Sequence, residues 1–260
     1  MFLIWIRKYV PRPFKRWIRN LQGWSYPIFY WTEPPLSKVP IVHSIPMYCI
    51  NLDRAIERRA FIEKNWIEEL GFDINFWKAQ DQRDLTEEDY RSLTKSDEAI
   101  KRVGRVLTRG EVACALSHRQ LYEYILKLGL EEVIVLEDDV GPNFLNREYF
   151  FNYIQQGKIE FPKADLFLLY DGANTFKKNE NKLFFSTLKV APFGAQLLYY
   201  TRAGLKKMVL GLEEINGPID LWGFYLFQDG TIALSNKPLG LHLNETSYIG
   251  NAGHLRKFIP

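Results

Sequence analysis

Cysteine and histidine are scarce in this sequence. Its 260 residues include two cysteines and four histidines. Cys49 and Cys114 each lie within an apolar segment, which predicts reduced core thiols in a chain that does not depend on disulfides. The cysteines and histidines also lack the spacing of a zinc motif. We therefore expect a domain held together by its core, with neither a disulfide framework nor a structural zinc ion.

A strong net charge and long apolar runs are missing as well. The formal net charge is +3, which gives no reason to expect a nucleic-acid partner. The apolar run at residues 2–6 is far too short to span a bilayer, which takes about 20 apolar residues. Because positive charges follow this run instead of preceding a longer one, it does not resemble a secretory signal. The expected location is the cytoplasm.

The sequence also lacks two motifs that mark common enzyme classes. It contains neither a Gly-x-Ser-x-Gly elbow nor a Walker A phosphate loop. Ser117 directly precedes His118 in a predicted helix, where neighbouring side chains point apart, so the two cannot act as nucleophile and base. These observations argue against a serine hydrolase and a P-loop enzyme.

The first 46 residues differ from the rest of the chain. The first acid is Glu33, and aromatic residues are interleaved with Arg7, Lys8, Arg12, Lys15, Arg16 and Arg19. Such a segment resembles an interfacial anchor, here on the anionic inner face of a membrane and formed by residues 1–25. The alternative is a basic arm that packs on the domain or is disordered. A proline-rich linker at residues 26–46 then leads to a folded domain at 47–260.

The folded domain follows the rhythm of an α/β fold. We predict a strand at 47–52, a helix with Asp53 as its N-cap and Gly71 as its C-cap, and a strand at 72–79. Further predicted elements are helices that begin at Thr86, at Thr108 (a capping box with Glu111) and at Thr201, and strands at 133–136, 166–170 and 195–200. The expected architecture is a central mixed sheet flanked by helices.

One predicted strand runs directly into three consecutive acids, Glu137, Asp138 and Asp139. The apolar residues 133–136 are typical of a strand buried on both faces, and ligands in such sheets bind beyond the carboxyl ends of strands. Buried carboxylates need a positive partner, so we expect Mn²⁺ or Mg²⁺ here. Alternation along the strand favours Glu137 and Asp139 as ligands, or Asp138 alone if the strand bends. The alternative is a solvated acidic turn at 141–143.

Four other residues are candidates for binding or catalysis. Arg54 and Arg58, expected on one helix face, can meet a diphosphate, or they form a solvated basic face. Asp220 lies in an apolar setting that raises a carboxyl pKa and so suits a general base, or it caps a helix. His242 is a candidate to complete a metal shell, or a surface histidine.

Several of these motifs, in this order, resemble glycosyltransferase family 25, which contains bacterial lipooligosaccharide galactosyltransferases and related collagen galactosyltransferases. The resemblance covers roughly residues 47–250, and the co-occurrence of the motifs makes it specific. The matching motifs are Ile50-Asn51-Leu52-Asp53-Arg54 with Arg58-Arg59, Leu107-Thr108-Arg109-Gly110-Glu111 with Cys114-Ala115-Leu116-Ser117-His118, Val135-Leu136-Glu137-Asp138-Asp139-Val140, Tyr199-Tyr200-Thr201-Arg202-Ala203-Gly204, and Pro218-Ile219-Asp220.

The resemblance implies a GT-A type fold, which is a Rossmann-like nucleotide-sugar-binding domain. It also implies an inverting transferase that moves galactose or a similar hexose from a UDP-sugar, with Mn²⁺, to a glycan acceptor such as lipooligosaccharide. Asp220 is the expected catalytic base. The expected metal ligands are Glu137, Asp139 and His242, and the expected donor-binding residues are Asn51, Arg54, Arg58, Ser117, His118 and Asp138.

Two other functions compete with this interpretation. A family member that has lost activity would use the same fold as a binding module. A metal-dependent phosphoryl-transfer enzyme would use a similar sheet, although the missing phosphate loop weighs against it.

Overall fold

The computed structural model describes residues 45–170, 185–187, 194–221, 231–235 and 237–243. Residues 1–44 of the predicted arm and linker, and residues 244–260 of the predicted domain, lie outside this described part. None of the helices within it is long and apolar enough to cross a membrane.

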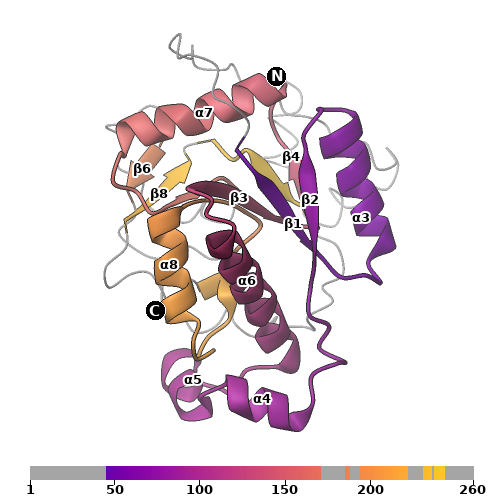
Figure 1. Cartoon of the computed structure of the whole chain (residues 1–260), viewed down its shortest axis with the longest axis vertical. Helices are drawn as coiled ribbons and strands as arrows, with labels where there is room; N and C mark the ends of the chain where they lie inside the picture. The colour runs from indigo at the N-terminus through magenta and orange to yellow at the C-terminus, as the bar shows by residue number, and fades with distance from the viewer. Residues whose placement is uncertain (1–44, 171–184, 188–193, 222–230, 236, 244–260) are drawn as a thin grey trace, which may run out of the picture. The chain divides into compact units, whose positions relative to one another are not determined.

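Within the described residues, seven strands form one mixed sheet (Figure 1). Strands β2, β1 and β3 are parallel to one another, whereas β7 and β6 run antiparallel to their neighbours. In spatial order the strands are β2 (Ile74–Lys78), β1 (Met47–Asn51), β3 (Glu132–Glu137), β7 (Leu197–Thr201), β5 (Leu166–Leu168), β8 (Ile232–Ser235) and β6 (Phe185–Thr187).

Helices pack around this sheet, and α6 and α8 lie side by side (Figure 1). A separate two-stranded ribbon pairs β4 (Val140–Pro142) with β9 (Gly240–His242). The helices are α3 (Ile56–Ile62), the π-helix η1 (Glu63–Glu68), α4 (Glu87–Leu93), α5 (Ser96–Val103), α6 (Arg109–Lys127), α7 (Arg147–Glu160), α8 (Arg202–Gly211) and the 3-10 turn η2 (Ile219–Leu221). The predicted α/β architecture with a mixed sheet flanked by helices is confirmed, and it is consistent with a GT-A type fold.

The local signals read from the sequence explain most element boundaries. Helices α4 and α6 begin after Thr86 and Thr108, as predicted, and each opens with a capping box, although the box was predicted only at Thr108. Gly129 follows α6 with a positive φ of 77°, a conformation that glycine adopts without a steric penalty. Thr201 caps α8, where its side chain accepts a hydrogen bond from the Gly204 amide.

The start of the first helix differs from the prediction. The Ala55 amide donates to the Leu52 carbonyl at 2.8 Å, so a tight turn closes before α3 begins. Ala55 therefore occupies the N-cap position, and Asp53 lies in the turn, where it pairs with Lys78 at the end of β2. The prediction of Asp53 as N-cap was wrong because this turn comes between the strand and the helix.

The same helix does not continue unchanged to Gly71. It widens after Ile62 into the π-helix η1, where the Glu69 amide donates to the Lys64 carbonyl. The fully buried Trp66 lies in this segment, packs edge-on against Phe72 and donates from Nε1 to the Val140 carbonyl at 3.0 Å. Helical spacing alone cannot predict this widening, which accompanies tertiary contacts of one large side chain.

The strand order places a natural ligand site between β1 and β3. The chain runs from β1 to β2 on one side and later returns to β3 on the other side of β1. Right-handed crossovers then place α3 and α6 on opposite faces of the sheet. Ligands in open α/β sheets bind at such a reversal of strand order, beyond the carboxyl ends of the strands. Asn51 and Glu137 end these two strands.

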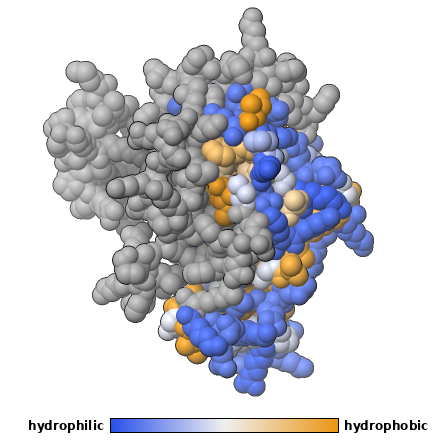
Figure 2. Space-filling view, turned by 90° about the vertical axis from the view of Figure 1, so that its left-hand side faces the viewer, coloured by the Kyte–Doolittle hydropathy of each residue, from blue (hydrophilic) through white to orange (hydrophobic). Residues whose placement is uncertain are grey.

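The exposed large apolar side chains come from different elements, for example Ile56 at the start of α3 and Leu210 in α8. The coloured surface in Figure 2 is mostly hydrophilic, and its apolar areas are small beside the hydrophilic ones. Scattered apolar side chains of this kind are ordinary on a protein surface.

Candidate active site

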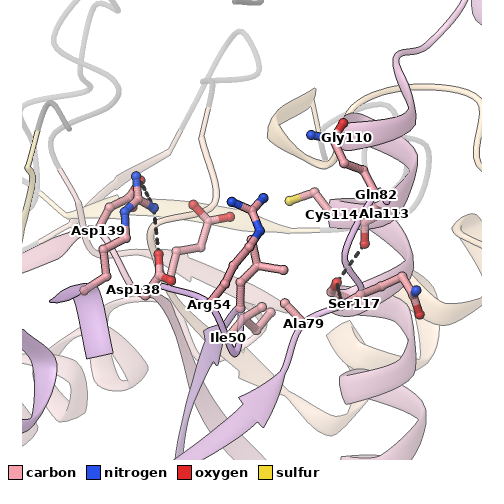
Figure 3. A pocket seen from close by; sticks show the side chains of 14 residues that line it. Ile50, Arg54, Ala79, Gln82, Gly110, Ala113, Cys114, Ser117, Asp138 and Asp139 are labelled. Carbon is pink, nitrogen blue, oxygen red and sulfur yellow. Dashed lines mark hydrogen bonds and ion pairs between the residues drawn. The ribbon is translucent and has the colours of Figure 1, made fainter. Parts of the chain in front are cut away.

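A pocket opens at the carboxyl ends of β1, β2 and β3 and is closed on one side by the first half of α6 (Figure 3). The three consecutive acids contribute to one wall. The lining residues are Ile50, Leu52, Arg54, Arg58, Ala79, Gln80, Gln82, Gly110, Ala113, Cys114, Ser117, Glu137, Asp138 and Asp139. The pocket therefore lies at the reversal of strand order.

Asp138 is anchored by two donors from β1 and α3. Asn51 Nδ2 donates to its Oδ2 and Arg58 donates to its Oδ1, both at 2.8 Å. All three residues are buried. Burial raises the pKa of the Asp138 carboxyl, and the Arg58 guanidinium opposes this shift. Both Asp138 oxygens therefore accept hydrogen bonds from protein, and these bonds orient the side chains of Asn51 and Arg58.

Asp139 is arranged differently and retains an unpartnered oxygen. Its Oδ2 lies 3.3 Å from His242 Nε2 and 3.5 Å from an Arg58 nitrogen. Its Oδ1 is buried and has no hydrogen-bond partner. The β4–β9 ribbon brings His242 here, because Val140 pairs directly with His242 in its register. The hydrogen bond that His242 donates to the Asp139 carboxylate raises the pKa of His242.

Glu137 faces the fully buried His118. Its Oε1 lies 3.2 Å from His118 Nε2, and His118 Nδ1 lies 2.8 Å from the Tyr122 hydroxyl. Burial lowers the pKa of His118 to about 4, so the imidazole is neutral at pH 7. Burial also raises the pKa of Glu137, and the neighbouring Asp139 and Asp138 raise it further. This contact is therefore a hydrogen bond to a neutral histidine.

The predicted alternation of the three acids is wrong beyond the strand end. Strand β3 ends at Glu137, and the chain turns at the next two residues, so all three acids line the same pocket. Each acid contacts a different partner. The structure brings Asp139 and His242 together as predicted, whereas Glu137 turns towards α6.

The remaining oxygen of Asp139 fits the chemistry of a cation site. A buried carboxylate oxygen without a donor is costly unless a cation or water satisfies it. Carboxylate oxygens and an imidazole nitrogen are ligands that Mn²⁺ accepts. Asp139 and His242 therefore fit a divalent ion, and Glu137 lines the same pocket.

Arg54 and Arg58 reach the same pocket from different elements. Arg54 lies in the turn before α3, so the two do not share a helix face as predicted, because the helix begins later than its sequence suggests. Arg54 Nε donates to Asp81 at 2.7 Å, and Arg83 donates to the same carboxylate. The Arg83 hydrogen bond holds the pKa of Asp81 well below its usual range.

The predicted solvated basic face applies to Arg59, not to Arg58. Arg59 is half exposed and pairs with Glu63 at 2.9 Å, one turn further along. Arg58 is buried against the acids.

Ser117 connects α6 to the loop after β2. Its hydroxyl donates to the Ala113 carbonyl at 2.7 Å and accepts from the Gln80 amide at 2.8 Å. Ser117 and His118 point to different neighbours, as expected for adjacent residues of a helix. The role of Ser117 in donor binding stays a prediction.

Asp220 lies in the short turn η2, which packs against α6. Its side chain is exposed, yet dense protein around it desolvates the carboxyl and raises its pKa to about 7, with a further contribution from Glu137. His118 lies close enough to oppose this shift. The charge of Glu137 thus affects the ionisation of Asp220, although Asp220 is not among the residues that line the pocket.

Removal of the buried Arg58 charge is expected to destabilise the fold. Arg58→Met would leave the buried Asp138 without its guanidinium partner, which costs about 3 kcal/mol or more. The adjacent Arg59→Met is the matched control, and because the Arg59 side chain is 50% exposed, we expect a loss below about 1 kcal/mol. Urea unfolding of both variants measures the difference, and equal losses would contradict the role of the buried pair.

The sequence interpretation missed two residues of this region. Asp81 lies in a polar loop with no motif, and only the folded chain shows that it holds Arg54 and Arg83. Cys114 was expected to be an inert core thiol, yet it lines the pocket. One signal was available: Cys114 and His118 are four residues apart in a predicted helix and so share a face.

Comparison with known proteins identifies a family and several relatives that this chain resembles. A family model for glycosyltransferase family 25, described as an LPS biosynthesis protein, matches residues 44–222. A glycosyltransferase 25 family member from Aedes aegypti is 29% identical over 246 residues, which cover 85% of this chain and 38% of the relative. Procollagen galactosyltransferase 1-B from Xenopus laevis is 31% identical over 56% of this chain and 25% of its own length.

An inactive relative matches over a shorter stretch. Inactive glycosyltransferase 25 family member 3 from Homo sapiens is 54% identical over 37 residues, or 14% of this chain and 6% of the relative. The chain thus spans 38% or less of the length of these three relatives.

A solved glycosyltransferase involved in glycosylation of the major capsid of PBCV-1 aligns with a TM-score of 0.40 and 10% identity, covering 82% of this chain and 98% of that one. The family model matches most of the present chain, from before β1 to η2. The chain therefore belongs to glycosyltransferase family 25.

Proposed function

We propose that this protein is an inverting glycosyltransferase that moves a hexose from a UDP-sugar to a hydroxyl of a glycan acceptor. The observation that carries the proposal is the orphaned, buried oxygen of Asp139, which lies beside Glu137 in a pocket that Arg54 and Arg58 also line. An acidic cluster that can hold a cation, next to arginines, suits a diphosphate.

The names of relatives support the choice of sugar and acceptor. One relative is a procollagen galactosyltransferase, which favours galactose as the transferred sugar. The family model is described as an LPS biosynthesis protein, which favours a lipooligosaccharide acceptor. Other relatives are named inactive, so a binding protein without activity is the main rival.

The residues expected to hold Mn²⁺ or Mg²⁺ are Asp139 and His242, with Glu137 as a third. When bound, such an ion would neutralise negative charge on the leaving diphosphate. Arg58 contributes a fixed positive charge, since Asp138 holds its guanidinium at 2.8 Å. Arg54 is steadied in the same way by Asp81. Both side chains are thereby held in place before a donor arrives.

Asp220 is the proposed base. Its carboxylate takes the proton of the acceptor hydroxyl, whose oxygen then bonds to the anomeric carbon on the face opposite the diphosphate. The bond from that carbon to the diphosphate breaks, so the configuration inverts and UDP leaves. A pKa near 7 suits this role, because the group is both ionised and basic at neutral pH.

Transfer is expected to fall in acid because the base must be ionised. With the pKa of Asp220 at about 7, kcat should be nearly constant above that pH and fall about tenfold per pH unit below it. The profile should be measured at saturating donor, acceptor and Mn²⁺, so that weaker metal binding in acid does not mimic the effect. A kcat that stays constant from pH 8 to pH 5 would contradict the assignment.

A screen of UDP-sugars tests the proposed function. The full chain is incubated with each UDP-sugar, with Mn²⁺ or with a chelator, and the products are separated. We expect metal-dependent release of UDP and free hexose, strongest for UDP-galactose. Release of UMP and sugar phosphate would instead support the phosphoryl-transfer alternative. No turnover, together with UDP binding, would support an inactive binding protein.

The N-terminal arm is proposed to hold the catalytic domain at the inner face of a membrane, where a glycolipid acceptor would lie. Its basic and aromatic composition supports this placement. Removal of residues 1–25 should weaken sedimentation with anionic vesicles, and unchanged sedimentation would refute the proposal.

A further inference from the structure

Three side chains of metal-binding type meet where α6 faces the end of β3. Cys114 and His118 are one turn apart on α6 and share a face, and Glu137 ends β3 opposite them. One ligand atom of each residue lies within 4.8 Å of the ligand atoms of the other two. Among the residues that the structure describes, no other trio of His, Cys, Asp or Glu side chains was found so closely grouped.

We propose that Cys114, His118 and Glu137 form a binding site for a thiophilic divalent ion such as Zn²⁺. In a tetrahedral zinc site with ligand bonds of about 2.0 to 2.3 Å, neighbouring ligand atoms are about 3.3 to 3.8 Å apart. His118 Nε2 and Glu137 Oε1 are already 3.2 Å apart. Small side-chain movements therefore suffice to admit the ion. No complete zinc motif is visible in the sequence, because Glu137 comes from another element.

The surroundings of His118 support ligation through Nε2. A metal-binding imidazole needs a partner for its other nitrogen, which fixes the ring and its tautomer. His118 Nδ1 lies 2.8 Å from the Tyr122 hydroxyl, which lies 3.0 Å from the Tyr200 hydroxyl. Since a tyrosine hydroxyl both donates and accepts, Tyr122 can accept a hydrogen bond from Nδ1–H when Nε2 binds the ion.

The fourth position of such an ion would face the pocket. Cys114 and Glu137 both line it, and Figure 3 shows the Cys114 sulfur directed into the cavity. Three protein ligands with one open position are typical of a zinc ion that binds water or a substrate oxygen. The site shares Glu137 with the proposed Mn²⁺ site, but it uses neither Asp139 nor His242. Its thiolate selects Zn²⁺ over Mn²⁺ and Mg²⁺.

Binding requires a defined proton release. The Cys114 S–H bond breaks, the proton passes to solvent, and the sulfur lone pair bonds to the ion. His118 keeps its proton on Nδ1. Burial raises the pKa of Glu137 to about 8, so its carboxyl O–H bond also breaks on binding, a second proton passes to solvent, and the freed carboxylate oxygen bonds to the ion.

Cobalt(II) provides the test because a thiolate bound to Co²⁺ gives a charge-transfer absorption. The metal-free full chain should show this band on addition of Co²⁺ and lose it when Zn²⁺ is added. Cys114→Ser should abolish the band and weaken Zn²⁺ binding at least about 100-fold, with the fold checked by circular dichroism. Cys49→Ser removes the chain's other thiol, buried in β1, and should keep the band.

The outcomes distinguish a failure of the proposed zinc site from a failure of the proposed transferase function. Absence of the band in the unmodified protein, or its survival in Cys114→Ser, would overturn the zinc site and leave Mn²⁺-dependent UDP binding unaffected. Asp139→Asn should keep the cobalt band and lose Mn²⁺-dependent UDP binding. Loss of the band in folded Asp139→Asn would place the cobalt ion at Asp139 and also overturn the proposed ligand set.

Discussion

Asp220→Asn is expected to abolish sugar transfer while donor binding stays intact. Asparagine is nearly isosteric with aspartate but cannot take the acceptor proton. Loss of a general base lowers the rate about 10²- to 10⁴-fold. Because Asp220 is not among the pocket-lining residues, the affinity for UDP with Mn²⁺ should remain close to that of the unmodified protein. The measurement is kcat with UDP-galactose and acceptor, beside calorimetry with UDP.

Glu213→Gln is the matched control for this variant. Glu213 is an exposed acid just beyond α8, and it should tolerate loss of its charge without a change in kcat. Normal turnover by Asp220→Asn would remove Asp220 as the base. A parallel loss of UDP binding would show that Asp220 acts on the donor instead.

Asp139→Asn is expected to remove metal-dependent binding of UDP. Loss of an outer partner of a metal site already costs about 10- to 100-fold in affinity, so loss of a direct ligand should cost at least as much. Calorimetric titration of UDP in the presence of Mn²⁺ measures the effect. In the presence of a chelator, the variant and the unmodified protein should bind UDP equally weakly.

Asp73→Asn is the matched control, because it makes the same change from aspartate to asparagine away from the pocket. Asp73 is exposed immediately before β2, at the opposite end of the strand from the pocket, so its removal should leave UDP binding unchanged. Unchanged Mn²⁺-dependent binding in Asp139→Asn would exclude Asp139 as a ligand.

Local signals in the sequence were sufficient to predict most of the architecture. The apolar run before Glu137 predicts a central strand, and β3 is buried along its length between its two ends. Thr86, and Thr108 with its capping box, predict where two helices begin, because a cap depends on residues close in sequence.

One error in the predicted fold has a local cause, and another has a cause distant in sequence. Asp53 looks like an N-cap, but a turn closed by Ala55 delays the helix. The π-helix around Trp66 accompanies packing against Phe72 and a hydrogen bond to Val140, none of which helical spacing reveals. Propensity is a weak prior that tertiary contacts override.

Six of the residues that line the pocket were named from the sequence, but most of their contacts were not. Asn51 and Asp138 are 87 positions apart and bond at 2.8 Å, a pairing that no local pattern contains. The direction of each acid depends on where β3 ends, and strand alternation does not apply beyond Glu137. Cys114 faces Glu137 only because α6 packs against the end of this strand.

The location of a bound Mn²⁺ ion is the most direct test of the proposed site. Crystals of the full chain grown with Mn²⁺ and UDP, and measured near the manganese absorption edge, should show an anomalous peak within bonding distance of Asp139, in the pocket between β1 and β3. UDP phosphate density should adjoin the peak. An ion bound away from Asp139, or UDP bound outside this pocket, would contradict the proposed metal-dependent transferase site.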